Sequence, residues 1–229
     1  MDSMYEMLME LPLFKGIGFN RLSEIVGTTR FHFLKFNDGE TIVEAGEPCT
    51  HIKFVISGAA RLTTVNSTGR MKISQTVSAP DVISPDFLFG KFTNQPATAV
   101  AIGPTGILQI EKLEYLKILH SDNVFLINFL NTLSIDAQKS VIGVLALTNG
   151  SLEERISFWV VALTQRGSTD IALQCRQRDF YSLFGVQRSS FISTLESMRD
   201  RGIVEFDQRE IRFLSRSALV DILTRQPTE

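Results

Sequence analysis

The sequence has few cysteines and no long apolar run. Cys49 and Cys175 are its two cysteines, and neither stands in a Cys-x-x-Cys or Cys/His spacing. This usage argues against a disulfide framework and a structural zinc site, so we expect both to be small buried residues. No stretch approaches the roughly eighteen apolar residues of a membrane span. The N-terminus carries acids where a signal peptide carries bases, and we therefore expect a cytoplasmic chain with no membrane segment.

The sequence also lacks the residue patterns by which enzymes are recognised. It contains no nucleophile placed beside a base, no paired acids, no phosphate loop and no set of metal ligands. We therefore expect no enzymatic activity, no metal site and no resident cofactor. The net charge of −2 argues against non-specific binding of polyanions as the main activity, although it leaves DNA binding open.

Lysine is absent from residue 151 onward, where eleven arginines are balanced by eleven acids. Any basic surface in this part of the chain must arise from local clustering of arginine. The sequence offers two such clusters, one of Arg176, Arg178 and Arg188 and one of Arg209 and Arg212.

The chain is long and apolar enough for two domains, since 44% of its 229 residues are hydrophobic. Residues 29–111 consist of short runs of strand type separated by turn signals, a pattern typical of an antiparallel barrel or sandwich. We expect seven strands, with turns at Ser57-Gly58 and Gly103-Pro104 among others. Short packing helices within residues 4–15 and 20–27 precede the strands.

A long helix is predicted for residues 112–147. A helix of this length extends beyond what a small domain needs for its own core. We expect part of its apolar stripe to pack on the same helix of a second copy about a two-fold axis. The alternative is that the helix lies wholly against its own barrel. The stripe comprises Leu126, Phe129, Leu130, Leu133, Ala137, Val141, Val144 and Leu145.

Residues 148–151 are predicted to form a hinge between a domain of residues 1–149 and a domain of residues 150–229. The stretch contains the turn residues Asn149 and Gly150, and Ser151 suits the N-cap of a following helix. Beyond that helix, the pattern predicts a short strand at 169–174, a hairpin within 203–214 and a last helix from 216 to 225.

Residues 177–204 have the pattern of two short helices joined by a sharp turn. Apolar residues recur every three or four positions on either side of Gly185, where the turn commonly needs a positive φ. A face of small side chains with one arginine near the helix start suits the major groove of DNA. A plain three-helix bundle, or a helix-turn-helix that binds protein, is the alternative. With Phe191, Thr194, Leu195 and Met198 inward, the opposite face carries Arg188, Ser189, Ile192, Ser193 and Glu196.

Several short motifs accompany this order of elements: Leu11-Pro12-Leu13-Phe14, Gly39-Glu40-Thr41-Ile42, Glu44-Ala45-Gly46-Glu47, the segment 51–58, and Arg155-Ile156. With them, the whole chain resembles the Crp/Fnr (cyclic-AMP receptor protein) family of bacterial transcription regulators. The resemblance implies an α+β fold with an N-terminal double-stranded β-helix (β-roll) of the cyclic-nucleotide-binding type, a long dimerisation helix and a C-terminal winged helix-turn-helix. It also implies a homodimer that binds palindromic double-stranded DNA, senses an effector in the roll and contacts RNA polymerase.

The family's base-reading positions match Arg188, Ser189 and Ser193 of this sequence. Arg188 keeps the family's usual arginine, so we expect it to read a base. The two serines replace the Glu and Arg of the prototype, which implies a different operator; capping of the helix start is their alternative role. We also expect Ile192 to meet a thymine methyl group, and phosphate contacts from Arg176, Gln177, Gln187 and Ser190.

The effector site departs from the family pattern. The family binds the ribose of cyclic AMP with the Glu of a Gly-Glu-Leu turn and its phosphate with an Arg, but here Ala97 stands where that Arg belongs. Burying the anion without a cationic partner is costly, so we expect no cyclic-AMP binding in the usual mode. Residues expected to line an apolar effector pocket, or to fill it, are Asp86, Phe87, Leu88, Thr98 and Ala99.

No other effector is indicated by the residues present. The iron–sulfur branch of the family needs four cysteines, and His32, His51 and Cys49 have no spacing that singles them out as haem ligands. A thiol switch at Cys49 is likewise unsupported. A function of another class also stays open, a ligand-binding regulatory module that acts through protein contacts.

Overall fold

The structure, a computed structural model, describes the backbone of residues 2–224 and the side chains within it except those of residues 2–4, 136 and 139–149. Contacts divide the chain into two compact units. The first comprises residues 1–62 and 77–136, and the second comprises residues 63–76 and 137–229. The division into domains at residue 149 stays a prediction.

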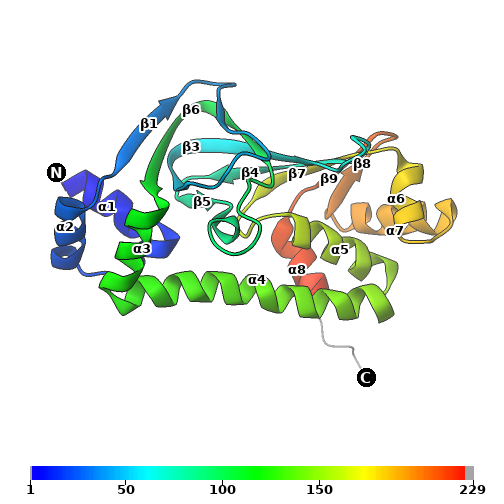
Figure 1. Cartoon of the computed structure of the whole chain (residues 1–229). Helices are drawn as coiled ribbons and strands as arrows, with labels where there is room; N and C mark the ends of the chain where they lie inside the picture. The colour runs from blue at the N-terminus through cyan, green and yellow to red at the C-terminus, as the bar shows by residue number, and fades with distance from the viewer. Residues whose placement is uncertain (1, 225–229) are drawn as a thin grey trace. The chain divides into compact units, whose positions relative to one another are not determined.

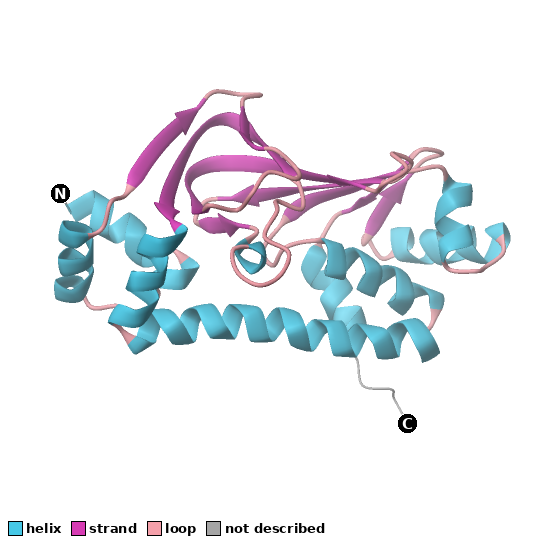
Figure 2. Cartoon of the chain, viewed as in Figure 1, coloured by secondary structure: helices cyan, strands magenta, loops and turns pink. Residues whose placement is uncertain are grey.

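The first unit is an antiparallel arrangement of strands accompanied by helices (Figure 1, Figure 2). β1 pairs with β6 from His32 opposite Gln109 to Phe36 opposite Thr105, and β5 pairs with β3. The expected roll-type fold with flanking helices is confirmed. Its strands are β1 (His32–Phe36), β2 (Thr41–Val43), β5 (Asp81–Ile83), β6 (Thr98–Glu111) and most of β3 (His51–Val65), whereas most of β4 (Lys72–Ser78) groups with the second unit. Its helices are α1 (Asp2–Glu10), η1 (Pro12–Phe14), α2 (Phe19–Thr28), η2 (Pro85–Phe87), α3 (Lys112–Ser121) and α4 (Asn123–Asn149), of which α4 groups with the first unit as far as residue 136.

Two of the predicted turns lie inside continuous strands, so the prediction of separate strands on either side of them is wrong. β3 runs through Gly58 and β6 runs through Gly103, and both glycines have positive φ, of 73° and 65°. A Cβ at Gly58 would overlap the carbonyl oxygen of Pro104. The glycines therefore permit a bend where two long strands approach closely, and the chain does not reverse there.

Two separate apolar cores stabilise the first unit. One lies where the helices meet the strands, and in it Phe14 packs edge-on against Phe54 at 5.7 Å and Phe125 at 5.3 Å between ring centroids. The Leu-Pro-Leu-Phe motif is thus a packing element, because its three apolar side chains are fully buried. The other core fills the roll with small and aliphatic side chains, Ala60, Ala99 and Ala101 among them.

The predicted helical stretch of residues 112–147 is divided into two helices, α3 and α4, so its predicted bounds are wrong, although the 27 residues of α4 confirm the prediction of one long helix. The break falls at Asp122, which has extended backbone angles (φ −156°, ψ 137°). Its carboxylate accepts a hydrogen bond from the backbone N–H of Val124 at 2.8 Å. Asp122 therefore caps the first turn of α4, as Asp commonly does at a helix start.

The second unit contains the C-terminal helices and a small antiparallel sheet. β7 pairs with β9, and β9 pairs with β8. Ser151 is the N-cap of α5 as predicted, in a reciprocal capping box with Glu154. At the other end of α5, the buried Arg216 donates to the carbonyl oxygens of Val161 and Thr164. The elements are α5 (Leu152–Leu163), β7 (Thr169–Gln174), α6 (Gln177–Leu183), α7 (Arg188–Asp200), β8 (Val204–Phe206), β9 (Glu210–Phe213) and α8 (Arg216–Thr224).

Both cysteines are buried and free, as predicted. Among the described residues, no helix has the length and apolar character required to span a membrane.

Candidate nucleic-acid interface

Residues 184–187 join α6 to α7 in a sharp turn. Gly185 has a φ of +64°, which confirms the predicted left-handed conformation. No described atom lies within 4 Å of the position that a Cβ on Gly185 would occupy, so the backbone angle and not crowding requires glycine. The backbone N–H of Val186 donates to the carbonyl oxygen of Tyr181 at 3.2 Å, which closes the turn.

Aromatic rings hold the two helices together. The ring of Phe180 on α6 lies 5.3 Å from that of Phe191 on α7 and 5.1 Å from that of Phe184, in edge-on contacts between centroids. Leu195 and Met198 are fully buried in the same core, so the predicted inward face of α7 is confirmed for its large side chains. Thr194 is half-buried.

The opposite face of α7 is exposed and carries Arg188, Ser189, Ser193 and Glu196, which we call the α7 stripe. Ile192 differs from the expectation, because its side chain is half-buried and packs against the core of the second unit. It therefore offers less apolar surface to an incoming partner than a fully exposed isoleucine.

The residues expected to contact phosphate lie near the start of α6 and α7. Arg176, Gln187 and Ser190 are exposed, whereas Gln177 is half-buried and its amide nitrogen donates to the carbonyl oxygen of Asp207 at 2.8 Å. Gln177 thus links α6 to the β8–β9 turn. Gln187, the N-cap of α7, makes no capping hydrogen bond with its side chain. Backbone N–H groups in such a first turn are suited to bind an anion.

The first predicted arginine cluster lies at the starts of α6 and α7. Arg176, Arg178 and Arg188 are exposed, and in the described part of the chain none of them is in an ion pair. The second predicted cluster is different. Arg212 lies 2.9 Å from the carboxylate of Asp170 and 3.3 Å from that of Glu210, so its charge is locally balanced. Arg209 is the other exposed cation of that hairpin.

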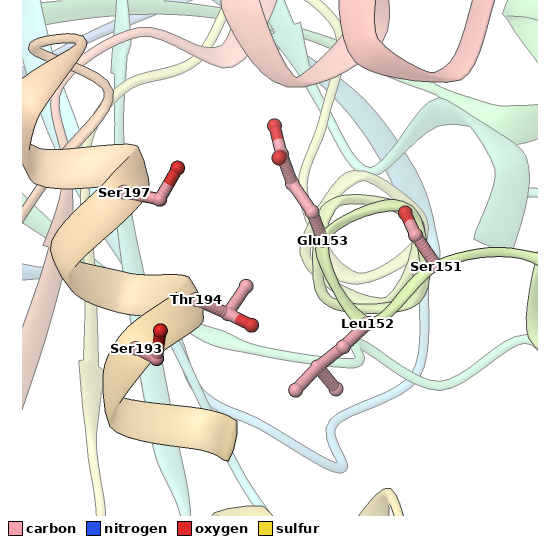
Figure 3. Close-up of a pocket in the computed structure, with 6 residues that line it drawn as sticks. All are labelled: Ser151, Leu152, Glu153, Ser193, Thr194 and Ser197. Carbon is pink, nitrogen blue, oxygen red and sulfur yellow. The ribbon is translucent and has the colours of Figure 1, made fainter. Parts of the chain in front are cut away.

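A hollow of about 260 Å³ lies between the start of α5 and one side of α7 (Figure 3). Ser193 and Ser197 of α7 line it, opposite Leu152 and Glu153 of α5. Ser193 therefore belongs to the edge of the α7 stripe that borders α5. Glu153 also bridges to Arg201 near the end of α7, at 2.6 Å, which fixes the two helices relative to each other.

Arg155 is a residue near the interface to which the sequence analysis assigned no structural role. It lies on α5, is half-buried, and its guanidinium lies over the ring of Phe184 at 5.5 Å from the ring centroid. The motif Arg155-Ile156 draws attention to this arginine. Its contact with residue 184 could not be predicted, because a contact between residues far apart in the sequence produces no periodic pattern.

The five residues expected at the effector site fall into different surroundings. Leu88 is buried in the core between helices and strands, and Ala99 is buried in the core inside the roll. Asp86 is exposed, and Phe87 is half-buried. The hydroxyl of the half-buried Thr98 accepts a hydrogen bond from the backbone N–H of Ala45 at 3.2 Å. The structure does not gather these side chains around one core.

The position of the missing phosphate-binding arginine is apolar. Ala97 is 5% exposed and belongs to the aliphatic core of the roll. Among the described residues of the first unit, no cationic side chain is fully buried; Lys53 of β3 is half-buried, and its desolvation lowers the pKa of its ammonium group. The residues present therefore do not fit a cyclic phosphate bound in the family's usual way.

Comparison with known proteins gives one matching family and several related structures. Residues 33–122 match the family described as cyclic nucleotide-binding domain. No curated protein matches the sequence.

Among solved structures, the catabolite activator protein of Thermus thermophilus has a TM-score of 0.54 at 18% identity, over 93% of this chain and 98% of that chain. The sensor domain of the transcriptional regulator DNR from Pseudomonas aeruginosa has a TM-score of 0.53 at 20% identity, over 61% and 92%. The N-terminal domain of a transcriptional regulator from Streptomyces coelicolor A3(2) has a TM-score of 0.50 at 19% identity, over 63% and 99%. At these identities the likeness establishes the fold. The predicted resemblance is therefore confirmed at the level of the fold: residues 33–122 match the cyclic nucleotide-binding domain, and the chain shares its fold with catabolite activator protein along most of its length.

Proposed function

We propose that the chain is a sequence-specific DNA-binding transcription regulator of the Crp/Fnr type, which acts as a homodimer on palindromic sites. In this proposal α6 and α7 are the helix-turn-helix, and β8 and β9 are the wing. The α7 stripe carries the proposal. Arg188 and the small Ser189 are exposed at the start of a helix whose opposite face is buried among phenylalanines.

Arg188 is assigned to base reading and the neighbouring groups to phosphate. A guanidinium can donate two hydrogen bonds to the edge of one guanine, which discriminates against other bases by about 1–3 kcal/mol. Ser189 and Ser193 are short enough to let the helix approach the groove. Arg176 and the first turn of α7 then contact the backbone of the duplex, which sets the register without reading sequence.

The homodimer is proposed from the exposed apolar side chains of α4. Leu130, which belongs to the predicted dimer stripe, is 45% exposed, and Ile127, about one turn before it on α4, is 52% exposed. A second copy of the helix packed about a two-fold axis would cover them. The part of that stripe at Val141, Val144 and Leu145 lies outside the described side chains.

We propose that the roll does not sense cyclic AMP bound in the family's usual mode. The position at which the family holds the phosphate is occupied by Ala97, in an aliphatic core. By family resemblance the regulator would also contact RNA polymerase at its promoters. No enzymatic step is part of the proposal.

Selection from a pool of random duplexes with the purified full-length protein tests the proposed function. We expect enrichment of a palindrome whose half-sites lie about one helical turn apart, because a two-fold dimer presents two α7 helices at that spacing. A pool that stays random after several rounds, at low and moderate salt, would overturn the proposal.

A further inference from the structure

The second unit contains a strand from the N-terminal part of the chain. Residues 63–76, which we call the strap, form the far end of the β3–β4 hairpin and group with residues 137–229. In the strap, β4 pairs antiparallel with β7, with Lys72 opposite Gln174 and Ile73 opposite Leu173. β7 pairs with β9 on its other side, so the strap completes a sheet in which β7 is an interior strand.

The strap also supplies a side chain to the core that supports α7. Ile73 is 6% exposed and belongs to the same apolar core as Phe191 and Leu195. Met71 is half-buried against that core. The packing of α7 therefore depends on a residue that is more than a hundred positions away in the sequence.

A buried polar contact fixes the position of the strap. Gln75 is 6% exposed, and its side-chain oxygen accepts a hydrogen bond from the backbone N–H of Gln165 at 2.6 Å, just beyond the end of α5. A buried side-chain amide is tolerated when it is hydrogen-bonded. Because a hydrogen bond is directional, this contact favours one position of the strap. The register shifts between Ser74 and Thr76, so the regular pairing is short.

We propose that the strap is an integral strand of the DNA-binding unit and the route by which the roll controls it. β3 and β4 pass from the first unit into the strap without a linker, so a change in the roll strands is transmitted directly to the pairing with β7. Docked on β7, the strap keeps α7 packed and able to bind DNA. Its release loosens α7 and lowers DNA affinity. The link to DNA affinity rests on the proposed function, but the link to the stability of the unit does not.

Hydrogen exchange of the full chain, read by mass spectrometry, tests the structural part. Ile73→Ser removes the buried side chain of the strap, and the matched control Val65→Ser changes a strap residue that is 52% exposed. We expect Ile73→Ser to speed exchange about thirtyfold in peptides covering 171–174 and 191–198, since loss of a buried aliphatic side chain has an effect of this size. The exchange rate of peptides covering 107–110 of the roll should stay unchanged, and the control variant should exchange like the wild-type protein throughout. Unchanged exchange in the second unit, or equal acceleration in the roll, overturns the proposal.

A disulfide lock tests the same contact while it leaves Ile73 in place. Ser74 and Ala172 are partners in the antiparallel register, a spacing that admits a disulfide after Ser74→Cys and Ala172→Cys. The oxidised protein should exchange more slowly in 171–174 and 191–198 than the same protein reduced. No difference between the two states overturns the proposal.

DNA affinity tests the regulatory part. On duplexes selected by the wild-type protein, Ile73→Ser should bind at least tenfold more weakly, and the oxidised lock should restore binding in the Ile73→Ser background. An unchanged affinity despite faster exchange overturns the regulatory role. If the wild-type protein selects no DNA, the proposed function fails, and the exchange results still decide whether the strap is a strand of the unit.

Discussion

Arg155 of α5 donates a hydrogen bond from its guanidinium to the carbonyl oxygen of Phe184 at 2.6 Å, at the residue where α6 ends. The last carbonyl groups of a helix lack hydrogen-bond partners within the helix and carry partial negative charge. A cationic donor at this position therefore supplies a hydrogen bond and also neutralises part of that charge. Arg155 therefore fixes the residue immediately before Gly185. Through that turn it also sets where α7 begins.

We predict that Arg155→Met lowers discrimination between the operator and random DNA about tenfold, because a hydrogen bond from a charged donor is lost at the turn. Affinity for random DNA should change little, since the phosphate-contacting groups remain. Arg155→Lys keeps a cationic donor and should recover part of the discrimination. Competition binding with the two kinds of duplex gives both numbers. Equal weakening on both would mean that Arg155 only holds the fold together.

The first unit should be more stable in mild acid because of Asp81. Burial raises the pKa of this carboxyl group to about 6, although the backbone N–H of Val82 bonds to it at 2.8 Å. The folded state therefore binds a proton more tightly than the unfolded state. The free energy of unfolding therefore rises as the pH falls from about 6 to about 4. Above pH 6 the folded protein bears the full cost of burying the ionised carboxylate.

Asp81→Asn should remove this penalty, because an amide oxygen can still accept from Val82 and carries no charge. The expected gain in the free energy of unfolding at pH 7.5 is up to about 3 kcal/mol, and the gain disappears near pH 4. Urea titrations at the two pH values measure it. A variant that keeps the wild-type dependence on pH would rule out Asp81 as its source.

Leu130→Glu should dissociate the proposed homodimer. A carboxylate placed in an apolar two-fold contact would face its own copy, and burying it would be costly. Leu113→Glu is the matched control, since Leu113 is 63% exposed on the neighbouring helix α3. Sedimentation velocity should give monomers for the first variant and dimers for the second. Dimers in both cases would place the two-fold contact elsewhere.

Cyclic AMP should not bind tightly to the roll. The site of its phosphate contains Ala97 in an aliphatic core, and the charge of the anion would be buried without a partner. Isothermal titration calorimetry should detect no binding with a Kd below about 1 mM. Micromolar binding would show that another cation reaches the phosphate and that the reading of Ala97 is mistaken.

The parts predicted well from sequence are those with local signals. Phe191, Leu195 and Met198 recur at helical spacing, and they are buried as that spacing indicates. Gly185 stands between two such patterns and has the positive φ that a sharp turn requires. Gly58 and Gly103 also predicted turns. At these two glycines, however, β3 and β6 continue, because pairing with strands distant in the sequence keeps the chain extended. A glycine alone does not distinguish a turn from a bend in a strand.

The parts that sequence could not supply depend on contacts between distant residues. The break at Asp122 had a local cue in the sequence Ser-Asp-Asn, which the prediction of one helix over 112–147 did not use. The pairing of Ile73 with the C-terminal core and the ion pair of Arg212 with Asp170 have no such cue. These residues meet only in the folded chain. As a result, the second unit includes residues that the sequence analysis placed in the first domain, and its hairpin has less unbalanced positive charge than expected.

The most direct test of the account is the affinity of Arg188→Ala for the selected operator, and for the same operator with one guanine of each half-site replaced. Arg166→Ala is the control, because Arg166 is an exposed arginine of the second unit that stands between α5 and β7 and is not part of the helix-turn-helix. We predict that Arg188→Ala binds the original operator about 10- to 100-fold more weakly and no longer distinguishes the two duplexes, whereas the control does. If Arg188→Ala bound and discriminated like the wild-type protein, the assignment of α7 as the base-reading helix would be contradicted.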